Sequence, residues 1–209
     1  MTMRKSEKKR TTAETSVRVS VNLDGVGESK IETGVGFFDH MLTLFAKHGG
    51  FDLVVKCKGD LAVDGHHSIE DIGIVLGEAV KEALGDKAGI ARYGSFYIPM
   101  DEALAFVALD ISGRNYLGYD VEFASMKVTD GSNEMRQMMV GSFDSELAEE
   151  FLMAFSREMG LTLHVKKLAG KNTHHIIEAT FKGLARALAK ACEIDERFKD
   201  EVPSTKGSL

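Results

Sequence analysis

Two copies of one short motif carry the side chains best suited to chemistry in this chain of 209 residues. The sequence HHxxE occurs at residues 66–70 and again at residues 174–178. On a helix, positions three and four residues apart share a face, so each motif brings two imidazoles and a carboxylate together. Those ligands suit a divalent transition metal. A single pair of histidines near a helix start could equally be chance surface residues or helix caps. The occurrence of the same motif twice favours metal binding, with two ions per chain.

The motifs belong to a longer internal repeat. Residues 66–84 align without a gap on residues 174–192, and seven of the nineteen positions are identical. Weaker matches precede it: Phe38-Asp39 with Leu42 recurs as Phe143-Asp144 with Leu147, and residues 21–24 recur as residues 107–110. Such self-similarity indicates a duplicated fold. We therefore expect two related halves, residues 1–91 and 92–195, followed by a C-terminal tail, residues 196–209.

The hydrophobic pattern predicts the elements that must position these motifs. Alternation of apolar and polar residues predicts strands over 17–23, 51–57, 103–109, 119–123 and 161–165. Apolar residues at helical spacing predict helices over 39–48, 69–84, 145–159 and 176–191. Two sheets would bury all four helical stripes if the helices met between them. The expected fold class is α/β (α+β), with each half a mixed four-stranded sheet that carries two helices on one face.

Composition limits the classes of function. With 44% hydrophobic and 28% charged residues, the chain has the balance of a soluble globular protein. Its net charge of −6 argues against a general nucleic-acid binder. No apolar run is long enough to span a membrane, and the basic first sixteen residues lack the apolar segment of an export signal. Cys57 and Cys192 show no CxxC spacing. We expect a cytoplasmic protein that binds neither nucleic acid nor membrane.

Several separated blocks resemble the imidazoleglycerol-phosphate dehydratase family of histidine biosynthesis. They are FFDHML (37–42), DGHHSIEDIG (64–73), ARYG (91–94), PMDEALA (99–105), SGRNYL (112–117), LHVKKLAGKNTHHIIEATFK (163–182) and PSTKG (203–207). The resemblance implies a ribosomal protein S5 domain 2-like fold and a lyase, more narrowly a hydro-lyase. That enzyme dehydrates imidazole glycerol phosphate to imidazole acetol phosphate. The resemblance also implies two Mn²⁺ ions per chain and a homo-oligomer of 24 subunits.

The same resemblance implies how the metal ligands are grouped, with each site shared between subunits. One site would use His40, His67, Glu70 and His175. The other would use His66, His174, Glu178 and the residue at position 150, which is Glu150 here and His in some relatives. A carboxylate is an acceptable ligand for a hard ion such as Mn²⁺. His164 is the alternative for that last position, although a hydrogen-bonded structural role is the simpler interpretation of a histidine on a strand.

The resemblance also assigns residues to the phosphorylated substrate. Arg suits bidentate phosphate recognition and Lys adds a point charge, although each such residue taken singly is more often solvated. One position departs from the family pattern, because Leu44 stands where many relatives have Gln. The tail is expected to close on the phosphate. The expected substrate contacts are Glu14, His48, Arg92, Asp101, Arg114, Lys182, Ser204 and Lys206. Five of them occupy the family's phosphate-contacting positions: Arg92, Arg114, Lys182, Ser204 and Lys206.

The chemistry of the reaction suggests which glutamate acts as base. Two metal ions on the ring nitrogens would favour imidazolate, which expels the neighbouring hydroxyl and gives a diazafulvene. A carboxylate would then remove the adjacent carbon-bound proton. We expect Glu178 to be that base, with Glu70 as its counterpart and mainly a ligand. Two other classes stay open on the residues alone: a dinuclear metal-dependent hydrolase of a small phosphate ester, and a metal-binding module without catalysis.

Overall fold

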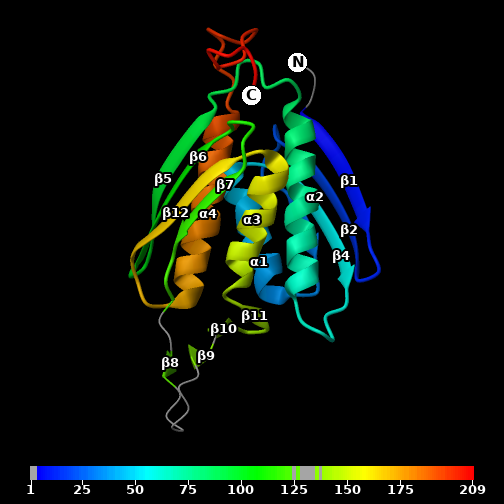
Figure 1. Ribbon diagram of the computed structural model, residues 1–209, viewed down its shortest axis with the longest axis vertical. Helices are drawn as coiled ribbons and strands as arrows, with labels where there is room; N and C mark the ends of the chain where they lie inside the picture. Colours follow the sequence, from blue (N-terminus) through cyan, green and yellow to red (C-terminus); the bar gives the residue numbers. More distant parts are fainter. Residues whose placement is uncertain (1–3, 124–125, 128–134, 137) are drawn as a thin grey trace.

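Two four-stranded sheets enclose a layer of four helices (Figure 1). This computed structural model describes residues 4–123, 126–127, 135–136 and 138–209. The first sheet contains β1 (Lys5–Thr11), β2 (Thr15–Asn22), β4 (Asp52–Gly59) and β3 (Ser29–Glu32). The second contains β5 (Tyr93–Met100), β6 (Ala103–Asp110), β12 (Thr162–Ala169) and β7 (Tyr116–Asp120). The helices are α1 (Gly36–Gly49), α2 (His66–Leu84), α3 (Leu147–Met159) and α4 (Thr173–Cys192).

The two sheets have the same topology, so the predicted duplication and fold class are confirmed. The strand orders β1-β2-β4-β3 and β5-β6-β12-β7 are equivalent, and the last pair of each sheet is parallel. Asn22 pairs with Asp52 in the first sheet, whereas Asp110 pairs with Thr162 in the second. Asn22 therefore corresponds to Asp110. The weak sequence match of residues 21–24 with 107–110 is therefore two residues out of register, because it aligns Asn22 with residue 108 instead of residue 110.

The helices fill the space between the sheets and form the shared core. Within this layer α2 packs against α3, and α1 packs against α4. α2 and α3 approach closely at two glycines of α2: an added Cβ at Gly73 or Gly77 would lie 2.8 Å from the carbonyl oxygen of Phe151 or Phe155, respectively. Phe38, Phe151 and Phe181 from three different helices are fully buried with their rings in contact. This packing fixes where the N-terminal turns of α2 and α4, and hence the two HHxxE motifs, lie.

Every predicted helix and strand is present, with differences at the ends. The strand predicted over 119–123 starts earlier and stops at Asp120. The sequence analysis missed β1, β3, β5 and four two-residue strands: β8 (Met126–Lys127), β9 (Met135–Arg136), β10 (Met139–Val140) and β11 (Phe143–Asp144). β1 is an edge strand of mostly charged and exposed residues, which lacks the alternation on which the prediction depends. β5 is the corresponding edge of the second sheet and contains Pro99, a residue that sheets tolerate at their edges.

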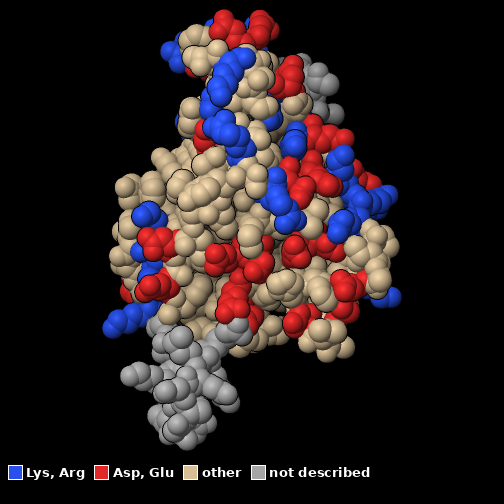
Figure 2. All heavy atoms as spheres, in the orientation of Figure 1, with Lys and Arg blue, Asp and Glu red and all other residues tan. Residues whose placement is uncertain are grey.

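The two ends of the helical layer differ in character. The N-terminal turns of α2 and α4 lie at the lower end in Figure 1, and the C-terminal tail, in red, lies at the upper end. Figure 2, in the same view, shows acidic side chains gathered across the lower middle of the molecule and a run of Lys and Arg side chains just below the tail, with further charges of both signs elsewhere. Within the described part of the chain, no helix combines the length and apolarity needed to cross a membrane.

Candidate active site

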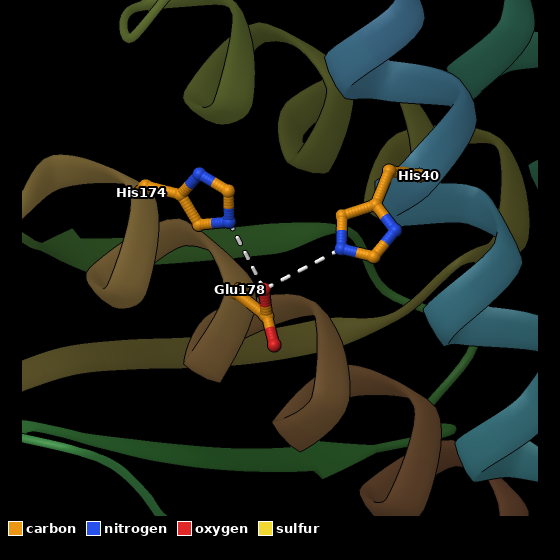
Figure 3. Close-up of side chains that lie close together, drawn as sticks. All are labelled: His40, His174 and Glu178. Atoms are coloured by element: carbon orange, nitrogen blue, oxygen red, sulfur yellow. Dashed lines mark hydrogen bonds and ion pairs between the residues drawn. The ribbon is translucent and has the colours of Figure 1, made fainter.

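Three candidate ligands converge where α1 meets the start of α4 (Figure 3). The Nε2 of His174 lies 3.1 Å from the Oε2 of Glu178, and the Nε2 of His40 lies 3.5 Å from the same oxygen. The three ligand atoms all lie within 4.8 Å of one another. Two imidazole nitrogens and a carboxylate oxygen this close together could hold a divalent cation. His174 and Glu178 are one helical turn apart on α4, as the motif spacing predicted.

The Glu178 carboxylate is buried but compensated by a cation. Its second oxygen, Oε1, lies 2.6 Å from the Nζ of Lys182, one turn further along α4. Burial raises the pKa of Glu178, yet the hydrogen bonds and charges of Lys182, His174 and His40 outweigh that effect, so its pKa lies below the ordinary value. Glu178 is therefore ionised at neutral pH, as a metal ligand or a general base must be.

The second histidine of each motif is held by a carboxylate from another element. At the start of α4, the Asn172 side chain caps the helix by accepting from the backbone N–H groups of His174 and His175. The Nδ1 of His175 lies 2.7 Å from the Oε2 of Glu102, in the turn between β5 and β6. This pairing lowers the pKa of Glu102 to about 2 and raises that of His175. Asp101 lies beside them, 3.7 Å from the Nε2 of His175.

The first motif, at the start of α2, shows the same arrangement. The Nδ1 of His67 lies 3.0 Å from Asp60, which precedes the helix, and 3.8 Å from Glu14. The hydrogen bond that His67 donates to the Asp60 carboxylate raises the pKa of His67. Glu70 is half-buried, with one oxygen 3.9 Å from Arg157 of α3. Glu14, one of the expected substrate contacts, thus lies beside a motif histidine.

A cleft of about 570 Å³ joins His66 to Glu150. The duplicated fold explains this pairing. α1 and α3 both end at a glycine in the left-handed conformation, Gly50 and Gly160. His40 and Glu150 lie equally far before those glycines, so Glu150 faces the α2 motif as His40 faces the α4 motif.

His164, the alternative to Glu150, lies elsewhere in the chain. It is an exposed residue of β12, between the inward-facing Leu163 and Val165, and its ring is 5.3 Å from that of Tyr116. It therefore projects from the outer face of the second sheet, away from the helical layer. Within one chain, Glu150 is the better placed of the two candidates.

Four of the five expected phosphate contacts gather at the opposite end of the molecule. A small cleft of about 250 Å³ is lined by Arg92, Arg114, Ser204 and Lys206. The Arg92 guanidinium holds the tail, because it donates to the carbonyl oxygen of Pro203 at 2.7 Å and to Asp110. The fifth contact, Lys182, lies with Glu178. Because α4 is about 30 Å long at 1.5 Å per residue, one chain cannot bring the cleft and the α4 motif to one small substrate.

The remaining candidates lie near α4. Burial lowers the pKa of His48, at the end of α1, and the charges of Lys182 and Arg186 lower it further. Leu44 lies on α1, one turn after His40, and packs against the core. The expected grouping placed His40 with His67 and His175, whereas within one chain His40 lies with His174 and Glu178. The grouping shared between subunits stays a prediction.

Sequence reasoning did not single out Asp60 or Glu102. Glu102 stands within the block PMDEALA but is 73 residues from its histidine partner. Asp60 lies seven residues before His67, outside the spacing of a helical motif. The duplication could have pointed to Glu102, because Glu102 and Glu14 occupy the same position in two equivalent hairpins and Glu14 was already a candidate site residue.

Comparison with known proteins identifies similar chains over the whole length. The family model described as imidazoleglycerol-phosphate dehydratase matches residues 33–188. An imidazoleglycerol-phosphate dehydratase from Caldanaerobacter subterraneus subsp. tengcongensis is 56% identical over 207 residues, covering 99% of this chain and 100% of that protein. One from Acetivibrio thermocellus is 56% identical over 206 residues, covering 99% of each.

Two solved structures share the fold. The crystal structure of the imidazoleglycerol-phosphate dehydratase from Staphylococcus aureus is 43% identical, with a TM-score of 0.77, and the match covers 91% of this chain and 99% of that one. The enzyme from Pyrococcus furiosus, solved in complex with (S)-C348, is 39% identical with a TM-score of 0.79. That match covers 97% of this chain and 100% of the other.

Proposed function

From the premise that this chain belongs to the imidazoleglycerol-phosphate dehydratase family, we propose how its residues carry out the reaction. The chain is an imidazoleglycerol-phosphate dehydratase, a lyase of histidine biosynthesis. The observation that carries this conclusion is the match of a whole-length relative at 56% identity. A hydrolase is not favoured, because the named relatives are dehydratases.

Two Mn²⁺ ions per chain are the proposed cofactors. The donor types fit a divalent ion, since nitrogens from His40 and His174 and an oxygen of Glu178 lie within 4.8 Å of one another in one chain. In the proposed sites, which are shared between subunits, His40 serves one ion, and His174 and Glu178 serve the other. The Glu150 carboxylate and His66 share the cleft beside the other motif. Carboxylate ligands suit a hard ion such as Mn²⁺, while the general affinity order places Zn²⁺ and Cu²⁺ above Mn²⁺, so metal supply contributes to the choice of ion. When bound to the imidazole ring of the substrate, the ions supply Lewis acidity that lowers the pKa of the ring N–H.

Glu178 is the proposed general base. The base must be ionised before it takes the carbon-bound proton, and the lowered pKa of Glu178 keeps it so. Lys182, 2.6 Å from Oε1, stabilises the carboxylate without occupying Oε2. Glu70, the equivalent residue of α2, is more exposed and has Arg157 as its nearest cation at 3.9 Å. Its proposed role is mainly that of a ligand.

Complete sites are proposed to form between subunits of a homo-oligomer with 24 copies. The supporting observation is the separation between the cleft lined by Arg92 and Arg114 and the motif of α4, at opposite ends of a helix about 30 Å long. A neighbouring subunit can supply the cleft that grips the phosphate while α4 supplies ligands and base. The tail, residues 196–209, closes over the phosphate by means of Ser204 and Lys206. A cytoplasmic location remains a prediction from the sequence.

One assay tests the reaction and its metal requirement together. Metal-loaded protein is incubated with imidazole glycerol phosphate, and the ketone product and free phosphate are measured with and without a chelator. We expect ketone without phosphate release, and loss of ketone when the chelator is present. Phosphate release without ketone would indicate a hydrolase instead. Ketone formation that survives complete metal removal would contradict the manganese proposal and leave the dehydratase assignment intact.

A further inference from the structure

Two carboxylates that are not among the proposed ligands fix the orientation of the motif histidines. Glu102 lies 2.7 Å from the Nδ1 of His175, and Asp60 lies 3.0 Å from the Nδ1 of His67. A carboxylate accepts hydrogen bonds, so the histidine nitrogen that faces it must carry the proton. In a neutral imidazole the other nitrogen, Nε2, then keeps its lone pair for a metal.

We propose that Glu102 and Asp60 are positioning residues that set the tautomer and ring orientation of His175 and His67, so that each presents Nε2 to a metal ion. The inference rests on the proposed metal-dependent function and adds two residues to it. Carboxylates that hold metal-binding histidines in this way strengthen metal binding without touching the ion. Both carboxylates pair with the second histidine of a motif.

The duplicated fold shows that the two halves reach this arrangement by different routes. Thr11 pairs with Ser16 in the first hairpin, and Pro99 pairs with Leu104 in the second. Glu14 and Glu102 both lie two residues before the second member of these pairs, so they are equivalent. Glu102 accepts a hydrogen bond from His175, the second motif histidine of its own half.

In the first half the equivalent histidine, His67, is hydrogen-bonded to Asp60, whose Oδ2 lies 3.0 Å from Nδ1. The Oε2 of Glu14 lies further from the same nitrogen, at 3.8 Å. The Glu14 side chain is 55% exposed. The first half therefore leaves its hairpin carboxylate available to the substrate, and the second half uses its own to hold a ligand. This division agrees with the expectation, taken from the family resemblance, that Glu14 contacts the substrate.

Glu102 also anchors the loop before α4, which dictates the choice of variant. Its Oε1 accepts from the backbone N–H groups of Lys171 at 3.2 Å and Asn172 at 2.8 Å. In Glu102→Gln, the amide oxygen can keep those two bonds while the NH₂ group faces the Nδ1 of His175. An NH₂ group donates, so it favours the tautomer with the proton on Nε2 and opposes metal binding. Asp60→Asn makes the same change at His67.

The experiment measures Mn²⁺ binding to metal-stripped full-length protein by calorimetric titration, with no substrate present. Because the proposed ligand set with His40 contains both His67 and His175, both variants should weaken the same one of two ions per chain. We expect about 10- to 100-fold weaker binding of that ion and wild-type binding of the other. Glu193→Gln is the matched control, since Glu193 pairs with Lys190 at the far end of α4. It should bind both ions normally.

A second measurement separates positioning from a general loss of structure. The thermal unfolding midpoint of the metal-free variants should equal that of the wild type, while the rise caused by Mn²⁺ should be smaller. Wild-type Mn²⁺ affinity in both variants would overturn the positioning roles alone. Equal weakening of both ions, or a lowered midpoint without metal, would replace them with a structural role. If the wild-type protein binds no Mn²⁺, the metal proposal fails and this inference fails with it.

Discussion

The Nζ of Lys182 lies 2.6 Å from the Oε1 of Glu178, on the opposite oxygen of the carboxylate from His174 and His40. The cation thus neutralises the carboxylate of a side chain that is only 8% exposed, and the other oxygen faces the candidate metal position. Lys182 is also an expected phosphate contact. A substrate phosphate that attracted Lys182 would weaken its hold on Glu178 and so make that carboxylate a stronger base.

Glu178→Gln should abolish most of the activity. A general base contributes about 10²- to 10⁴-fold to the rate, so we expect kcat to fall by that factor. Steady-state assays of ketone formation measure it, alongside metal content. Glu70→Gln is the comparison, because Glu70 holds the same place in the α2 motif. Near-normal turnover of Glu178→Gln with full metal content would show that the base lies elsewhere.

Lys182→Met should destabilise the metal-free protein. Removal of one partner from a buried ion pair leaves an uncompensated charge, which costs about 3–5 kcal/mol. The Lys182 and Glu178 side chains are 17% and 8% exposed, so we expect a value near the lower end of that range. Denaturant unfolding measures it. The double variant with Glu178→Gln should recover part of the loss, and a double variant as unstable as Lys182→Met alone would argue against the pair.

Two inactive variants should complement each other when they are assembled together. Glu178→Gln removes the base at one end of the chain and Arg114→Ala removes a phosphate contact at the other. If each site takes these residues from different subunits, random co-assembly at equal amounts restores about a quarter of the activity of the wild type. Unfolding and refolding the mixed variants together, then assaying ketone formation, tests this. No recovery in a properly assembled mixture would place both residues of each site in one chain.

Asp24→Asn should flatten the acid dependence of stability. Arg4 donates hydrogen bonds to the Asp24 carboxylate and lowers its pKa below the ordinary 3.8. A group whose pKa is lower in the folded chain contributes stability above its unfolded pKa and loses it as the pH falls through the folded value. Thermal midpoints measured from neutral pH down to about pH 3 should therefore fall less steeply in the variant than in the wild type. Parallel curves would show that Arg4 does not affect the titration of Asp24.

The motifs and the core elements could be predicted because each has a short-range signal. The 3.6-residue period marks α2 and α4, and the repeat of HHxxE marks their first turns. The partners of those motifs have no such signal. Glu102 reaches His175 only because β5 and β6 form a hairpin beside α4, and nothing in the local sequence around residue 102 reports that contact.

The separation of the phosphate contacts from the metal ligands also could not be read from the sequence. Lys182 and Arg92 were assigned to one phosphate, yet Lys182 lies near the middle of α4, beside Glu178, whereas Arg92 lies at the far end of the helix, where its backbone N–H donates to the carbonyl oxygen of Ala191. Which residues share a site depends on how copies of the chain meet. That arrangement is a property of the assembly and leaves no periodic trace along a single chain.

The two hairpins have equal lengths, so each half of the duplicated fold places a glutamate at the same point of its first hairpin. Glu102 contacts the second histidine of the α4 motif, whereas Glu14 stands 3.8 Å from the corresponding histidine of the α2 motif. At His67 the carboxylate partner is Asp60, which comes from the loop before α2. Two residues at equivalent positions of a duplicated fold can therefore have different partners, and Glu14 and Glu102 are such a pair.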